Sequence, residues 1–142
     1  PEFVTGGIDL YEALRDDNIE LAISAYKRWG FENLNKDLIE ILNIWAKFIY
    51  QPLLEDRIRP ISEMPTGQYG RKTAEKVHKE LKKIGGVKPP REFVLMDRAA
   101  VGLGSVFMHL KSEVNWHKVF ENMIEDFKVE KLSKNQKKVA KL

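Results

Sequence analysis

The adjacent charges Asp97 and Arg98 are the residues of this sequence best placed to do chemistry, because they interrupt the otherwise mostly apolar run 93–110. A charge in apolar surroundings is costly unless it is paired or hydrogen-bonded. A catalytic aspartate is one interpretation, but no lysine, asparagine or second acid accompanies Asp97 at motif spacing. We therefore expect one or both residues to hydrogen-bond other segments and to fix the position of their helix, which is a structural role.

Further along the same run, Gly102-Leu103-Gly104-Ser105 has part of the spacing of a phosphate-binding glycine loop. Such loops follow a strand and open a helix, where free amides face the phosphate. These glycines fall inside a predicted helix, where the amides are already bonded, and the third glycine is missing. Ser105 and His109 are four residues apart, but nothing marks a third triad member or an oxyanion hole. We predict helix packing at both places.

The three histidines, His78, His109 and His117, do not have the spacing of a metal site. Helical ligands usually stand three or four residues apart and converge on one ion. His109 and His117 are eight apart, with a predicted turn between them. We therefore predict no catalytic, cofactor-binding or metal-binding residue in this chain.

The spacing of apolar residues predicts helices nearly everywhere and no strand. Asp17 or Asn18 and Asn115 are candidate caps, one helix should start near Asn35, Gly30 and Gly85-Gly86 should end helices, and Pro52 should kink or end one. The predicted helices cover about residues 4–14, 19–29, 35–51, 71–84, 91–111 and 116–127, and residues 56–70 are predicted to be irregular.

The helix predicted over 91–111 is apolar on almost every side, so we expect it to be the buried centre of the domain. Ala100 and Gly104 would let a neighbouring helix approach closely. A membrane span is the alternative, but Asp97 and Arg98 make it costly. We predict an all-α domain over residues 1–127 and a Lys-rich mobile tail over 128–142.

Composition indicates one soluble globular domain: 142 residues without cysteine, which fits a reducing compartment. The net charge of +3 is unevenly distributed, with balances of −5 over residues 1–57, +6 over 71–91 and +5 over 128–142. Such basic segments permit contact with anionic lipid or nucleic acid. No aromatic residues alternate with these lysines, so solvated surfaces are the simpler interpretation and no nucleic-acid partner is expected.

One block of the sequence resembles a known family. The run from Pro89 to Gly104, Pro-Pro-Arg-Glu-Phe-Val-Leu-Met-Asp-Arg-Ala-Ala-Val-Gly-Leu-Gly, resembles the carboxy-terminal segment of the UbiB/AarF atypical kinase-like proteins. Pro1-Glu2-Phe3-Val4, Asp16-Asp17-Asn18 and Trp29-Gly30-Phe31 are similar to the stretch that follows that family's metal-binding aspartate. The resemblance spans about residues 1–127.

The resemblance implies the carboxy-terminal part of a protein-kinase-like helical lobe. Family members bind nucleotide and are linked to ubiquinone biosynthesis and isoprenoid lipid handling, often at a membrane, so ATP and magnesium are implied for the parent protein alone. The sequence contains neither Lys-x-Gly-Gln nor Asp-Phe-Gly, so no catalytic residue carries over. The implied partners are the upstream part of the same lobe and a membrane or lipid surface, and the implied location is cytoplasmic or peripheral to a membrane. The alternative is an independent helical module that binds a protein or an anionic membrane through residues 71–91.

Overall fold

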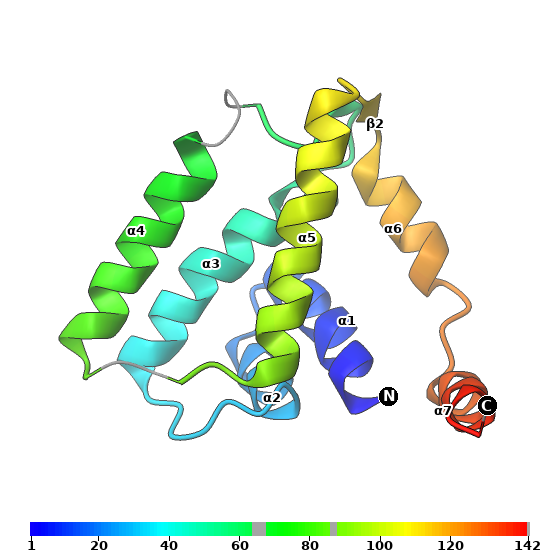
Figure 1. Ribbon diagram of the computed structural model, residues 1–142, viewed down its shortest axis with the longest axis horizontal. Helices are drawn as coiled ribbons and strands as arrows, with labels where there is room; N and C mark the ends of the chain where they lie inside the picture. Colours follow the sequence, from blue (N-terminus) through cyan, green and yellow to red (C-terminus); the bar gives the residue numbers. More distant parts are fainter. Residues whose placement is uncertain (64–67, 86–87, 142) are drawn as a thin grey trace.

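A computed structural model describes residues 1–63, 68–85 and 88–141, and of residues 68–70 the backbone alone. Within these ranges the chain forms seven helices and one two-stranded antiparallel ladder (Figure 1). The elements in chain order are α1 Glu2–Arg15, α2 Ile19–Arg28, α3 Lys36–Leu54, β1 Arg59–Pro60, α4 Gln68–Lys83, α5 Arg91–His109, β2 Glu113–Val114, α6 Trp116–Ile124 and α7 Val129–Val139. The all-α prediction is confirmed except for this ladder.

The core lies between α1, α2 and α3. Among the described residues, the buried apolar residues other than Gly6, Pro52 and Trp116 fall between positions 10 and 50, and the most enclosed are Leu10, Tyr11, Ala25 and Tyr26. Glycine makes the contact of α1 with α2 possible: a Cβ added at Gly6 would stand 3.0 Å from the Trp29 ring. The indole instead lies against the backbone of α1, and its Nε1 donates a hydrogen bond of 2.9 Å to the carbonyl of Phe3.

Side-chain caps begin three helices near their predicted starts, and the cap at Asn35 was not predicted. Asn18, Asn35 and Asn115 each accept a hydrogen bond from the backbone amide three residues later, at 3.1, 2.8 and 3.0 Å. Each cap satisfies one of the amides that a first helical turn leaves without a partner. Gly30 follows α2 with a φ of +90°, the left-handed conformation that glycine adopts readily.

One local prediction is wrong, and the structure adds detail to two others. The prediction that no strand forms is wrong, because Arg59 pairs with Val114 and Pro60 with Glu113. A ladder of two residues is too short for an alternating pattern to reveal it. Pro52 stands inside α3, which ends two residues later at Leu54. The predicted tail includes the helix α7, although α7 buries none of its residues. The predictions at Gly86 and over residues 64–67 lie outside the described residues.

The expectation that α5 is the buried centre is also wrong. None of its residues is buried, because it lies on one side of the α1–α3 core and only one of its faces makes contact there (Figure 1). The apolar residues on its other side are exposed to solvent. An apolar helix is central only when other elements cover all of its faces, and the described part of the chain covers one.

Candidate functional site

The inner face of α5 is held at three positions along its length. Near its beginning, the Phe93 ring packs on Trp29 and Phe31, with centroid distances of 5.4 and 5.1 Å. Near its end, the Phe107 ring lies 4.7 Å from that of Trp116. Between them stands the polar contact of Asp97. These contacts orient α5, so the opposite face points away from the core.

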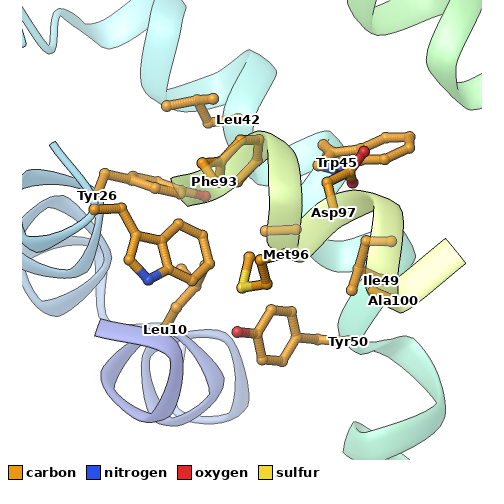
Figure 2. A pocket seen from close by; sticks show the side chains of 12 residues that line it. Leu10, Tyr26, Leu42, Trp45, Ile49, Tyr50, Phe93, Met96, Asp97 and Ala100 are labelled. Carbon is orange, nitrogen blue, oxygen red and sulfur yellow. Dashed lines mark hydrogen bonds between the residues drawn. The ribbon is translucent and has the colours of Figure 1, made fainter. Parts of the chain in front are cut away.

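Asp97 connects α5 to α3. Its Oδ1 accepts a hydrogen bond of 2.9 Å from the Trp45 Nε1 (Figure 2). Burial raises the pKa of the Asp97 carboxyl, and the Trp45 hydrogen bond opposes that rise in part. Arg98 is exposed and forms no ion pair or hydrogen bond with the described residues. The expected structural contact is therefore found for Asp97, and Arg98 takes no part in it.

The space under α5 is too small for a substrate. A cavity of about 30 Å³ lies between α5 and the core, lined mainly by apolar side chains, with Asp97 and Tyr50 among its polar groups (Figure 2). Small-molecule sites usually have several hundred cubic ångströms. The cavity is a packing defect beneath the helix.

A second, more open hollow of about 530 Å³ lies where the α2–α3 loop meets the beginning of α5. Its lining includes Glu32, Asn33, Lys88 and Arg91, all of which are polar or charged. All four side chains are exposed. The hollow has the volume of a ligand site without the buried polar groups that give such a site specificity.

The outward side of α5 is apolar and uncovered. We call it the outer α5 face, and it consists of Leu95, Ala99, Gly102, Leu103, Val106 and Leu110. The large members of this face are each more than half exposed, from 51% at Val106 to 68% at Leu110. Monomeric proteins seldom expose a contiguous apolar surface of this kind unless something binds it.

The other residues singled out on α5 do not form a site. Gly102 to Ser105 lie within the helix, which confirms that their amides are not free to bind phosphate. His109 Nδ1 lies 2.8 Å from the backbone carbonyl of Ser105 and therefore donates a hydrogen bond to it. The ring is thus bonded to the backbone of Ser105 and not to its hydroxyl. Ala100 faces the small cavity, and a Cβ added at Gly104 would meet no described atom within 4 Å. The expected close helix approach at Gly104 is thus not found.

Sequence reasoning missed a polar network between α1 and α6. The Tyr11 hydroxyl donates a hydrogen bond of 2.5 Å to Glu121, and Arg15 lies 3.5 Å from the same carboxylate oxygen. The Nδ1 of His117 is 3.2 Å from that hydroxyl and 2.7 Å from the carbonyl of Leu53. Burial, together with the neighbouring Glu121, raises the pKa of Tyr11. The α1 and α6 partners are more than 100 residues apart, and Leu53 is 64 residues from His117, so no local pattern could have revealed these contacts.

A second missed cluster surrounds Arg59, a cation of which only 3% is exposed. Its Nη1 lies 2.6 Å from Glu55 Oε2, within ion-pair distance but without hydrogen-bond geometry. Burial raises the pKa of Glu55, but hydrogen bonds from Arg57 and Gln51 and the charge of Arg59 bring it below its ordinary value. Trp116 Nε1 donates to the Arg59 carbonyl at 2.9 Å, which fastens α6 to this segment. Glu55, Arg59 and Glu63 stand four residues apart, and this spacing of opposite charges was the signal in the sequence that could have indicated the cluster.

The basic residues of α4 form one exposed row. Lys72, Lys76 and Lys79 recur at intervals of four and three residues, so they share one helical face. All three are exposed and none forms an ion pair with a described residue, whereas Arg71 and Lys83 are paired with Glu75 and Glu80. His78 is also exposed.

Comparisons with protein-family models, curated proteins and solved structures find no match to this chain. Within the described ranges, no three His, Asp or Glu side chains gather as metal ligands do. No described helix combines the length and the apolar character needed to cross a membrane. The outer α5 face and the α4 lysine row are therefore the features from which a function can be argued.

Proposed function

We propose that this chain is the non-catalytic carboxy-terminal part of a UbiB/AarF-type atypical kinase or ATPase, and that it completes the helical lobe of that enzyme. The observation that carries this proposal is the outer α5 face. The block Pro89–Gly104, on which the resemblance rests, forms the first part of α5 and contributes most of this face. A helix with both sides apolar is expected where protein lies on both sides.

The chemistry of the parent would belong to residues outside this chain. Phosphoryl transfer needs a glycine-rich cover, a lysine that contacts phosphate, and metal-binding Asp and Asn side chains. The glycines of α5 lie within a helix, and Asp97 is bonded to an indole. ATP and magnesium, and the link to ubiquinone biosynthesis and isoprenoid lipids, are accordingly proposed for the parent.

The first experiment reads the coding sequence upstream of Pro1 for an Asp-Phe-Gly-like motif and then compares the longer protein with the 142-residue chain by calorimetry. We expect the longer protein to bind magnesium-ATP and the short chain not to do so. Micromolar, magnesium-dependent and salt-resistant ATP binding by the short chain would refute the proposal. Weak, salt-sensitive binding is the expected behaviour of the basic α4 toward any polyanion.

The α4 lysine row supports a second candidate, an independent helical module that binds an anionic membrane surface. Juxtaposed lysines each contribute about 1 kcal/mol to binding at an anionic bilayer. The test is co-sedimentation with vesicles containing phosphatidylserine, using Lys72→Gln, Lys76→Gln and Lys79→Gln together against Lys131→Gln, Lys134→Gln and Lys137→Gln on α7. Binding that is lost only with the α4 triple variant, in a protein without an upstream kinase-like motif, would favour this candidate.

A further inference from the structure

We propose that the outer α5 face is the docking site for one amphipathic protein helix whose apolar stripe is flanked by acidic residues. This inference deepens the proposed function, which supplies the source of that helix, namely the upstream part of the same lobe. The occupant is inferred from the shape, charge and orientation of the face.

The shape of the face suits a helix. Leu95 and Val106 lie eleven residues apart and therefore on one side of α5, with Ala99 and Gly102 between them. Small residues between larger ones let another helix approach the backbone and insert its side chains. A Cβ added at Gly102 would meet no described atom within 4 Å, so the space above this glycine is open.

The charges around the face indicate which residues should border the apolar stripe of the helix that binds there. Four cations lie beside it or at its ends: Arg91 and Arg98, seven residues apart on one edge of the helix, Lys88 before α5, and Lys111 after its end. All four are exposed, and none lies within ion-pair distance of a carboxylate in the described part of the chain. Glu92 is the single exposed acid on α5 itself. A partner with Asp or Glu beside its apolar stripe complements this arrangement, and one with lysines would be repelled.

Two other occupants fit the face less well. A second copy would bring the same four cations against each other in a symmetric pair. A lipid surface would accept the cations, but it gains little from the opening at Ala99 and Gly102, and the face has no Trp or Tyr to anchor at a bilayer surface. A protein helix with acidic flanks uses the apolar residues, the small residues and the cations together.

The test is site-specific photo-cross-linking in the longer protein that contains this chain. A benzophenone amino acid replaces Val106 on the outer α5 face or, as a matched control, Val139, which is an exposed valine of α7. We expect position 106 to cross-link to one helix with acidic flanks, with a yield at least fivefold above that of position 139. Arg98→Glu should lower the yield severalfold, and Lys131→Glu on α7 should not.

Two glycine variants separate docking from folding. A Cβ added at Gly102 or at Gly104 meets no described atom within 4 Å, but only Gly102 belongs to the outer α5 face. Gly102→Leu should reduce the cross-link at least fivefold, and Gly104→Leu should leave it near the original yield. Thermal unfolding of the isolated 142-residue chain should show that both variants fold.

The outcomes separate this inference from the proposed function. A cross-link to an upstream helix of the same polypeptide supports both. A cross-link to an acidic-flanked helix of another protein supports the docking site and refutes the proposed function. A cross-link to lipid, to α5 of a second copy, or one no stronger than that at position 139 overturns the docking site.

Discussion

Helices α1 to α3 and helix α5 are both rich in apolar residues, yet the first group encloses a core and α5 leaves one apolar face in solvent. The buried residues of α1–α3 contact one another across three helices, as Leu10, Tyr26 and Leu42 do. On α5, Phe93 and Met96 pack against that core, while Leu95 and Val106 face outward. The apolar content of a helix thus shows how much of its surface would gain from burial. How much is actually buried depends on the elements that pack against it.

The largest expected effect comes from shortening a side chain in the core. Leu10 is fully buried, so Leu10→Ala removes apolar contacts and leaves a cavity. We expect a loss of about 2–5 kcal/mol in the free energy of unfolding, measured by urea denaturation. A loss below about 1 kcal/mol would mean that the α1–α3 region is not the stabilising core.

Gly6 and Gly7 offer a sharper test of that core, because they are adjacent in α1 but meet different neighbours. An added Cβ stands 3.0 Å from the Trp29 ring at Gly6 and 3.7 Å from the Tyr50 hydroxyl at Gly7. We expect Gly6→Ala to destabilise by about 1–3 kcal/mol through overpacking. Gly7→Ala should stabilise by about 0.5–1 kcal/mol, since alanine favours the helix. Equal melting temperatures for the two variants would contradict the packing of α1 on α2.

Asp97 and Arg98 test the contact between the two regions. Asp97→Ala leaves the Trp45 Nε1 without its acceptor, so we expect a loss of about 1–2 kcal/mol. Arg98→Ala should change stability by less than about 0.5 kcal/mol, because Arg98 is exposed and unpaired within the described structure. Thermal melts of both variants at neutral pH measure the difference, and a larger loss for Arg98→Ala would reverse the assignment.

The pH dependence of Asp97 follows from its raised pKa. The folded state holds the Asp97 proton more tightly than the unfolded state does, so this proton contributes to the free energy of unfolding. The contribution is fully present below the ordinary aspartate pKa of about 3.9 and is lost as pH rises through the higher pKa of the folded state. Asp97→Asn keeps an acceptor for Trp45 but cannot titrate. The stability of the original chain relative to that of Asp97→Asn, measured from pH 3 to 7, should therefore decrease as pH rises. Parallel curves would exclude a raised pKa.

The smallest effect is expected on the outer α5 face. Leu95 is 58% exposed, so Leu95→Ala should change the stability of the isolated chain by less than about 0.5 kcal/mol. The same leucine-to-alanine change at Leu10 should lower the free energy of unfolding several-fold more. A loss above about 1.5 kcal/mol at Leu95 would show that the face is covered within this chain.

Local sequence was enough to predict where most helices form. The caps at Asn18 and Asn115 and the turn at Gly30 depend on interactions within a few residues, so composition and spacing indicated them, although Asp17 was an equal candidate for the first cap. The importance of Asp97 was also predictable, because a carboxylate in an apolar run needs a partner wherever it folds.

The long-range contacts of each helix are visible only in the folded structure. The contact of Tyr11 with Glu121 and that of Trp116 with the carbonyl of Arg59 join segments dozens of residues apart, and helical periodicity contains no information about such pairs. For the same reason, the sequence showed that α5 is apolar all round but not which of its sides the core would cover. Burial depends on where neighbouring elements lie, whereas helix formation depends mainly on the residues themselves.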